Sequence, residues 1–321
     1  MIELNFKTEG ALMNKVNVGV VGTGYLGSLH ARVYSQLKNV NLVCVCDIDK
    51  KRAKKVAKKY RVWHLPDYHT LFDKVDAVSI AVPTSLHYKI AKDFLHNNIH
   101  VLIEKPIAKT VDEAQELINI ADSKNLKIQV GHIERFNPVV RAVEPLLKEP
   151  RFIECHRAGP YRKKKRVKDI GVVLDLMIHD IDIILSLVKS EVDSIEAVGI
   201  STISPYEDIA NVRLNFKNGA IADITASRVT KEEVRKIKIS QEDSYITLDY
   251  LHHDAHVVKK TDDRVIKKRI QIEKREPLKQ ELKSFIFSIQ NNVKPVVSGR
   301  EGKLALGVAM DILEKIKFPK K

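Results

Sequence analysis

The chain has 321 residues, which is long enough for two domains that each bury a core. Hydrophobic residues make up 44% of the sequence and charged residues 30%, as in ordinary globular proteins. No apolar run reaches the roughly 18–20 residues that a membrane-spanning helix needs. The formal net charge of +14 is spread over both halves of the chain, whereas a nucleic-acid-binding protein usually concentrates its charge on one face or tail. These features predict a cytoplasmic protein and disfavour membrane and nucleic-acid partners.

The first part of the chain alternates between short apolar runs and stretches with helical periodicity. Residues 1–12 lack the pattern of a secretory signal, and they precede Met13. We therefore expect either a mobile leader or a start codon placed too early. Alternation of this kind predicts βαβ units, a doubly wound parallel sheet and helices on both of its faces. Strands are predicted at 16–21, 41–46, 76–82, 100–103 and 127–130, and helices at 25–37, 50–60, 86–97 and 111–123.

After about residue 134 the pattern changes to successive strand-like runs, with Asn218-Gly219 as a hairpin turn signal. We expect an N-terminal dinucleotide-binding domain at 1–133 and a substrate-binding α+β domain at 134–321, built on a mostly antiparallel sheet. The C-terminal helix is expected to pack back onto the first domain. Strands are predicted at 195–201, 209–216, 220–227, 235–240, 244–250 and 256–260, and helices at 171–188, 277–290 and 302–315.

Gly22, Gly24 and Gly27 form a G-x-G-x-x-G sequence between the first strand and the first helix. In this context Gly22 permits a tight turn, Gly24 lets the backbone approach a pyrophosphate, and Gly27 allows close packing of the helix. The helix N-terminus would then present its N–H groups to the phosphates. Asp47 ends the next strand, where a carboxylate accepts hydrogen bonds from ribose hydroxyls and repels a 2′-phosphate. The sequence therefore predicts a dinucleotide site that prefers NAD to NADP.

Further residues of the predicted cofactor site lie in the loops that follow the parallel strands, because ligands bind beyond the carboxyl ends of such strands. These residues are Tyr25, Leu26, Ile48, Arg52, Pro83, Thr84, His87, Glu104 and Lys105.

The predicted helix at 171–188 is apolar except for Asp175, His179 and Asp182, which recur at i, i+4 and i+7 and so form one polar stripe. A polar stripe on a buried helix costs stability unless its members have partners. It is therefore either an internal polar network or a site that faces a cleft.

These motifs together resemble the Gfo/Idh/MocA family of oxidoreductases, and the resemblance spans most of the chain. It rests on five motifs in the family's order. They are Gly22–Gly27, Pro83-Thr84-x-x-His87, Glu104-Lys105-Pro106, Gly131-His132-x-x-Arg135-Phe136-x-Pro138 and Asp175-x-x-x-His179. The resemblance implies that Lys105, Asp175 and His179 line a sugar site and that the bond before Pro106 is cis.

The chemistry of alcohol oxidation fits these three residues. The imidazole of His179 can take the hydroxyl proton near neutral pH, and the ammonium of Lys105 can stabilise the developing alkoxide charge. Asp175 can orient a substrate hydroxyl or tune His179. We favour His179 as the base, although the residues alone leave Lys105 as an alternative.

Within the family, the segments at 131–138 and 171–182 are similar to a branch that oxidises the 3-hydroxyl of UDP-N-acetylglucosamine and supplies the ketone to an aminotransferase. The basic cluster at 162–166 suits a diphosphate. Expected substrate-binding residues are Lys105, Arg135, Phe136, Arg162, Lys163, Asp175 and His179, although Arg135 fits a structural ion pair equally well. A free sugar or polyol, such as inositol or glucose, is the alternative substrate. A non-catalytic dinucleotide sensor is the alternative function, and a homo-oligomer is expected by analogy with the family.

The cysteines and the remaining histidines do not predict a metal site or a reactive thiol. Cys44, Cys46 and Cys155 form no C-x-x-C pair and are predicted to be buried, inert thiols. His252, His253 and His256 lack a ligand set at metal-binding spacing, so we expect no metal.

Overall fold

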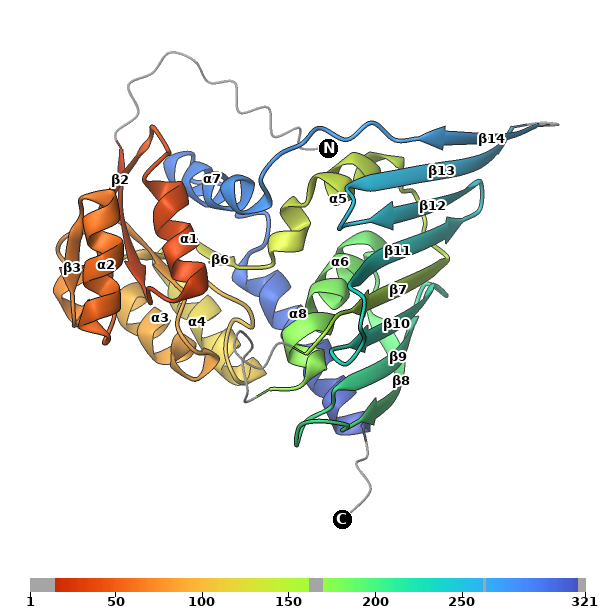
Figure 1. The fold of residues 1–321 in the computed structure, drawn as a ribbon, viewed down its shortest axis with the longest axis horizontal. Coiled ribbons are helices and arrows are strands. Elements are labelled where there is room, and N and C mark those ends of the chain that lie inside the picture. The colour runs from red at the N-terminus through yellow and green to blue at the C-terminus, as the bar shows by residue number, and fades with distance from the viewer. Residues whose placement is uncertain (1–14, 162–169, 262–263, 317–321) are drawn as a thin grey trace.

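A computed structural model describes residues 15–161, 170–261 and 264–316, and it contains two sheets that lie side by side (Figure 1). The first sheet is parallel, with strand order β3-β2-β1-β4-β5-β6. This order reverses between β1 and β4, as in doubly wound dinucleotide-binding folds. The strands are β1 Val16–Val21, β2 Val40–Cys46, β3 Trp63–Leu65, β4 Ala77–Ile80, β5 His100–Ile103 and β6 Ile128–Val130.

Helices cover both faces of this sheet. Since successive strand residues point to opposite sides, neighbouring residues pack against different helices. Val20 packs with helices α1, α2 and α7, whereas its neighbour Val21 packs with α3 and α4. The prediction of a doubly wound parallel sheet is therefore confirmed. The helices are α1 Tyr25–Tyr34, α2 Lys50–Tyr60, α3 His87–His96, α4 Val111–Ser123 and α7 Pro277–Gln290.

The second sheet has the order β14-β13-β12-β11-β7-β10-β9-β8, and its strand pairs are antiparallel except for β7 with β10. The predicted turn at Asn218-Gly219 joins β9 to β10, and Gly219 has a φ of +80°. The prediction of a mostly antiparallel sheet is confirmed. The strands are β7 Phe152–Ala158, β8 Val192–Ile200, β9 Ile209–Phe216, β10 Ile221–Ser227, β11 Val234–Gln241, β12 Ser244–Asp249, β13 Asp254–Thr261 and β14 Arg264–Arg269.

Three helical elements cover one face of the second sheet: α5 Pro138–Val143, α6 Ile178–Val188 and part of α8 Gly299–Lys315. The alternation along β9 shows this plainly, because Val212 and Leu214 are buried under the helices whereas Asn211 and Arg213 are exposed. The first sheet faces the helical side of the second sheet (Figure 1).

The last two helices connect the two sheets. Leu282 and Phe285 of α7 belong to the same buried cluster as Val18 of β1. Helix α8 contacts both sheets, since Gly302 lies against Val130 of β6 whereas Ala309 lies in the core of the second sheet. The helices of the C-terminal half thus contact the first sheet, while the domain boundary at 133/134 stays a prediction.

Two strands of the second sheet, β7 and β14, were absent from the predicted set. Every residue of β14 is exposed, and its Arg-Val-Ile-Lys-Lys-Arg sequence lacks the apolar face that identifies a strand. The predicted helix at 171–188 is confirmed from residue 172 onward, but Val173–Met177 forms a π-helical turn, labelled η5, that leads directly into α6.

The three cysteines of the chain are buried free thiols, as predicted. Burial raises the pKa of both Cys44 and Cys46 to about 12. Because the thiolate is the nucleophilic form, these thiols are inert near neutral pH.

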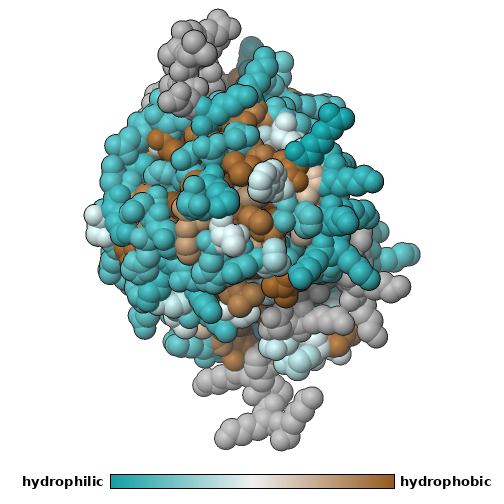
Figure 2. Space-filling model, turned by 90° about the vertical axis from the view of Figure 1, so that its left-hand side faces the viewer, coloured by the Kyte–Doolittle hydropathy of each residue, from teal (hydrophilic) through white to brown (hydrophobic). Residues whose placement is uncertain are grey.

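Seen from the side of the first sheet, the surface is mainly hydrophilic, with apolar side chains interspersed among polar ones (Figure 2). Trp63 of the edge strand β3 is 72% exposed. In the described ranges no helix combines the length and apolar composition that crossing a bilayer requires.

Two glycines of α8 test the contact between this helix and the first sheet. A Cβ atom added to Gly302 would lie 2.6 Å from Val130 Cγ2, whereas one added to Gly307 would meet its nearest atom at 3.9 Å. We expect Gly302→Ala to lower the free energy of unfolding by about 1–3 kcal/mol through overpacking. Gly307→Ala should raise it by up to about 1 kcal/mol through helix propensity. Urea titrations of both variants measure this, and equal shifts of the same sign would contradict the packing argument.

Candidate active site

The candidate site lies beyond the carboxyl ends of β1, β4 and β5, where the strand order reverses. The glycine loop follows β1, Pro83 and Thr84 follow β4, and Glu104 and Lys105 follow β5. Parallel strands end at one edge of the sheet, so three loops that are distant in the sequence meet there.

The three glycines of the loop have different structural roles. Gly22 has a φ of +89°, and a Cβ atom added to it would lie 2.3 Å from the carbonyl oxygen of Ala81. A Cβ atom added to Gly27 would lie 1.8 Å from the carbonyl oxygen of Gly22. In contrast, a Cβ atom at Gly24 would meet only the Arg52 Nη1 atom, at 3.8 Å. Gly22 and Gly27 are therefore required by the fold, and the space at Gly24 is open to a ligand.

Asp47 supports the glycine loop from the end of β2. Its Oδ2 atom accepts hydrogen bonds from the backbone N of Thr23 at 2.7 Å and from the Thr23 hydroxyl at 2.8 Å, and its Oδ1 atom accepts one from the backbone N of Asp49 at 2.9 Å. Thr23 was not among the predicted site residues. Its position between two glycines was the signal that could have identified it.

The other residues predicted near the cofactor surround this loop. Tyr25 is 77% exposed and Ile48 is 91% exposed, so both have room to contact a ring of a bound ligand. Leu26 and Pro83 are also exposed, and Thr84 begins a 3₁₀ turn. Arg52 is paired with Asp49, with 3.2 Å between Nη2 and Oδ2. Exposed apolar side chains beside helix N–H groups and a carboxylate fit a dinucleotide.

His87 lies beneath the loops of the site. It is 1% exposed, its Nδ1 atom is 2.8 Å from the carbonyl oxygen of Pro106, and its Nε2 atom is 2.9 Å from that of Val82. These two contacts join the loops that follow β4 and β5. The predicted role of His87 at the cofactor would therefore be indirect, through the position of these loops.

Lys105 connects the first sheet to the start of the polar helix. The Lys105–Pro106 bond is cis. The Lys105 ammonium donates a hydrogen bond to the backbone carbonyl of Asp175 at 2.6 Å, and it lies 3.5 Å from Asp175 Oδ1. Both side chains are largely buried. The structure thus brings together two of the three predicted catalytic residues, which are separated by 70 positions in the sequence.

His179 lies close to this pair. Burial lowers the pKa of His179 well below its usual value, and the positive charges of Lys105 and Arg157 lower it further. The imidazole is therefore neutral near pH 7 and can accept a proton. Lys105, Asp175 and His179 form a cluster that contains a cation, a carboxylate and a neutral base.

A buried pair of side chains, Glu104 and His30, supports the loop that carries Lys105. Glu104 Oε1 lies 3.0 Å from His30 Nε2, and the side chain of His30 is fully buried in α1. Burial alone would raise the pKa of Glu104, but the hydrogen bond from His30 and the nearby charge of Lys105 lower it overall. His30 was not predicted, because a lone histidine in an apolar helix gives no clear signal of a partner.

The start of the polar helix is fixed by Glu207, which lies just before β9. The backbone carbonyl of Glu207 accepts from the N–H of Val172 at 2.9 Å, and its Oε1 atom accepts from the N–H of Val173 at 3.1 Å. A Cβ atom added to Gly171 would lie 1.9 Å from the same Oε1 atom. This close contact holds the π-helical turn that contains Asp175.

Asp182, the third member of the predicted stripe, does not join the cluster of Lys105, Asp175 and His179. It is 3% exposed, and its Oδ1 atom lies 3.9 Å from Arg135 Nη1. Burial raises the pKa of Asp182 to about 7 in spite of the opposing effect of Arg135. The structural ion pair considered for Arg135 is therefore present, and a role of Arg135 at the substrate stays a prediction.

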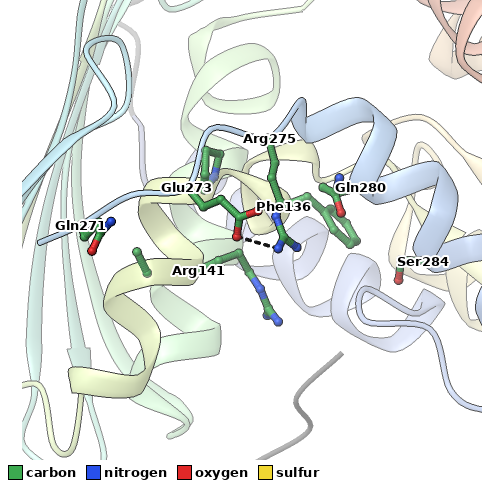
Figure 3. Close-up of a pocket in the computed structure, with 9 residues that line it drawn as sticks. Phe136, Arg141, Gln271, Glu273, Arg275, Gln280 and Ser284 are labelled. Atoms are coloured by element: carbon green, nitrogen blue, oxygen red, sulfur yellow. Dashed lines mark hydrogen bonds and ion pairs between the residues drawn. The ribbon is translucent and has the colours of Figure 1, made fainter. Parts of the chain in front are cut away.

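Phe136 lines a pocket that contains neither Lys105 nor His179. This pocket, of about 320 Å³, is formed between α5, α7 and the segment that joins β14 to α7 (Figure 3). Arg141 and Arg275 enter it from two sides, and Arg275 is paired with Glu273 at 2.6 Å (Figure 3). The predicted contact of Phe136 with a substrate stays untested. Arg162 and Lys163, with the rest of the basic cluster, lie outside the described residues.

The glycine loop gives a direct test of dinucleotide binding. Gly24 has a φ of −63° and a ψ of −160°, which alanine can adopt, so Gly24→Ala should fold normally. We expect it to weaken NAD binding by about tenfold or more, which is about 1.4 kcal/mol, because the added methyl group occupies the ligand's approach. Gly27→Ala is the matched control and should instead lower the unfolding temperature. Calorimetric binding with thermal unfolding measures both, and unchanged NAD affinity of a folded Gly24→Ala protein would count against the assigned site.

Comparison with known proteins agrees with this geometry. A family model described as an oxidoreductase family with an NAD-binding Rossmann fold matches residues 16–132. A second model, described as a GFO/IDH/MocA C-terminal domain, matches residues 146–246. Together the two models cover most of the chain.

Similar proteins include several sugar and polyol dehydrogenases. A UDP-N-acetylglucosamine 3-dehydrogenase from Acidithiobacillus ferrooxidans is 32% identical over 307 residues, which cover 94% of this chain and 97% of that protein. A solved structure of that enzyme aligns with a TM-score of 0.90 at 31% identity, and the alignment covers 95% of this chain and 98% of the other. The scyllo-inositol 2-dehydrogenase (NAD(+)) of Bacillus subtilis is 27% identical over 324 residues, covering 92% of this chain and 93% of that protein.

The fold is also shared with more distant structures. A levoglucosan dehydrogenase in complex with NADH aligns with a TM-score of 0.87 at 18% identity, which demonstrates a common fold. The family models, the long alignment at 32% identity and the site at the switch point all agree. The chain therefore belongs to the GFO/IDH/MocA family of oxidoreductases, with an NAD-binding Rossmann domain in its N-terminal part.

Proposed function

We propose that this protein is an NAD-dependent dehydrogenase that oxidises the 3-hydroxyl of UDP-N-acetylglucosamine, or of a closely related nucleotide sugar, to a ketone. The observation that carries the proposal is the convergence of Lys105, Asp175 and His179, with Lys105 in the loop that follows β5 of the same parallel sheet as the glycine loop. The substrate is suggested by the similarity to the Acidithiobacillus enzyme, which extends over 94% of the chain.

In the proposed mechanism, His179 takes the proton of the reacting hydroxyl. The ammonium of Lys105 lies where it can stabilise negative charge on the same oxygen, as preorganised donors do in many enzymes. Asp175 orients Lys105 through its carbonyl oxygen at 2.6 Å, and its carboxylate can accept from a sugar hydroxyl. When it is bound, NAD supplies the acceptor of the hydride from the sugar carbon.

The preference for NAD over NADP rests on Asp47. A 2′-phosphate beside this carboxylate would be repelled. Asp47 also accepts hydrogen bonds from Thr23 and Asp49, which hold it beside the glycine loop. Arg52, the nearest cationic candidate for a phosphate, is paired with Asp49 instead. These residues therefore favour a free ribose over a phosphorylated one.

The cofactor site would be formed by Gly22–Gly27, Asp47, Ile48, Pro83 and Thr84. The nucleotide-sugar site would include Arg135, Phe136, Arg162 and Lys163. The charge of the cluster at 162–166 suits the diphosphate. We further propose a cytoplasmic homo-oligomer whose ketone product passes to an aminotransferase. A second candidate, a dehydrogenase of a free polyol, is favoured by the similarity to the inositol enzyme over 92% of the chain.

A substrate assay separates the two candidates. We expect NADH formation from NAD with UDP-N-acetylglucosamine, and far slower reaction with NADP, myo-inositol or glucose. Neutral substitution of Lys163–Arg166 should raise the KM for the nucleotide sugar strongly, because a diphosphate loses charged partners. Absence of a 3-keto product, together with turnover of a free polyol that is insensitive to these substitutions, would support the second candidate.

The role of His179 is tested by substitution and by the pH dependence of the rate. We expect His179→Ala to lower kcat by about 10²–10⁴-fold and to leave the affinity for NAD unchanged. Because the pKa of His179 lies well below 6.5, its neutral form persists as the pH falls, and the acid limb of kcat/KM in the wild type should lie below pH 6.5. Glu273→Ala, in the separate pocket, is the control. Wild-type turnover by His179→Ala would leave Lys105 as the base.

A further inference from the structure

His132 is a buried histidine beside the catalytic cluster that the proposed mechanism does not use. It follows β6 and precedes the 3₁₀ turn Ile133–Phe136. The preceding residue, Gly131, packs so closely on Glu104 that an added Cβ atom would lie 2.9 Å from its Oε2 atom. The backbone of His132 is thus fixed against the loop that carries Lys105, and its side chain is 1% exposed.

Both ring nitrogens of His132 lack a hydrogen-bond partner among the residues that the structure describes. A buried polar group without a partner lowers the stability of a fold, and an apolar ring of similar size would not have this cost. Packing alone therefore gives no reason for a histidine at this position. Such orphaned groups in native structures call for a functional explanation.

The neighbour that supplies an explanation is His179. The two imidazole rings meet edge to face, with centroids 6.1 Å apart and an interplanar angle of 87°. In His179 the Nδ1 atom is buried, and it has no partner within the described ranges. The rings lie somewhat further apart than two hydrogen-bonded imidazoles. Catalytic hydrogen bonds are often long in the absence of ligands and tighten when a substrate binds.

The surroundings of the two rings explain why the N–H group of His179 needs a hydrogen-bond acceptor. Burial is the main cause that opposes a positive charge on His179, and Lys105, Arg157, His132 and Arg235 oppose it further. Burial is also the main cause that lowers the pKa of His132 to about 3, with Lys105 and Arg135 lowering it further and Glu104 opposing them. His132 therefore stays neutral and keeps a lone pair available, and it does not compete for the proton.

We propose that His132 is a positioning residue for His179, whose neutral imidazole accepts a hydrogen bond from Nδ1–H of His179 and so presents Nε2 as the base. The inference rests on the proposed function of His179. During oxidation, the O–H proton of the substrate moves to Nε2 of His179, and the hydride moves from carbon to NAD. The resulting imidazolium keeps its Nδ1–H bond to His132. An uncharged acceptor thus has the role that a carboxylate has in many catalytic histidine pairs.

The test compares His132→Phe, which keeps the ring but removes both nitrogens, with His132→Gln, which restores an acceptor oxygen. We expect His132→Phe to lower kcat by about 10²-fold while KM and the affinity for NAD stay unchanged. Its unfolding midpoint should equal or exceed that of the wild type, because a buried orphan group is removed. His132→Gln should recover part of kcat. His252→Phe, a change at a side chain that is 75% exposed, is the control for removal of a histidine.

A second readout does not depend on turnover. Nitrogen NMR of the imidazoles should show His179 as the Nδ1–H tautomer in the wild type and as a different tautomer or a mixture in His132→Phe. If no sugar is oxidised by the wild type, the proposed function fails, whereas this tautomer and the unfolding midpoints still decide the role of His132. Full kcat in His132→Phe, an unchanged tautomer, or activity and stability lost together without recovery in His132→Gln would each overturn the proposal.

Discussion

The hydrogen bond from the Lys105 ammonium to the Asp175 carbonyl oxygen is the contact on which the arrangement of the site depends. It connects the loop that follows β5 of the first sheet to the π-helical turn η5, which packs on the second sheet. Each end is held separately. The buried Glu104–His30 pair fixes the lysine, and Glu207 fixes the turn that carries Asp175. Because both ends are fixed, a cation, a carboxylate and an imidazole stay close together without direct bonds among all three.

The electrostatics of the site follow from this geometry. Burial is the main cause of the low pKa values of His132 and His179, and the positive charge of Lys105 lowers both further. Both imidazoles are therefore neutral at a pH where exposed histidines begin to take up protons. A neutral base beside a fixed cation suits alcohol oxidation, which needs a proton acceptor and stabilisation of negative charge on one oxygen.

The polar helix carries different polar residues on two of its faces. Asp175 and His179, which lie on the face toward Lys105, remain partly accessible. Asp180 is buried in a bidentate pair with Arg157, at 2.7 and 2.8 Å. Arg157 also donates to Glu134 at 3.0 Å. This buried network anchors the helix beside His179. One face of this helix thus forms a structural ion pair, and another face carries the candidate site residues Asp175 and His179.

The sequence alone determined the alternation of the first sheet, the antiparallel character of the second and the glycine loop with Asp47, and its resemblance to a family pointed to Lys105, Asp175 and His179 as candidates. These features depend on local periodicity and on short motifs, which are encoded by neighbouring residues. Only the tertiary structure decided that Asp182 pairs with Arg135, that His87 joins two loops, and that Phe136 faces another pocket. It also revealed Thr23, His30 and His132, and the π-helical turn at Val173–Met177. The physical reason is that a partner distant in the sequence leaves no local pattern, since burial, charge and hydrogen bonding are set by the packing of the two sheets.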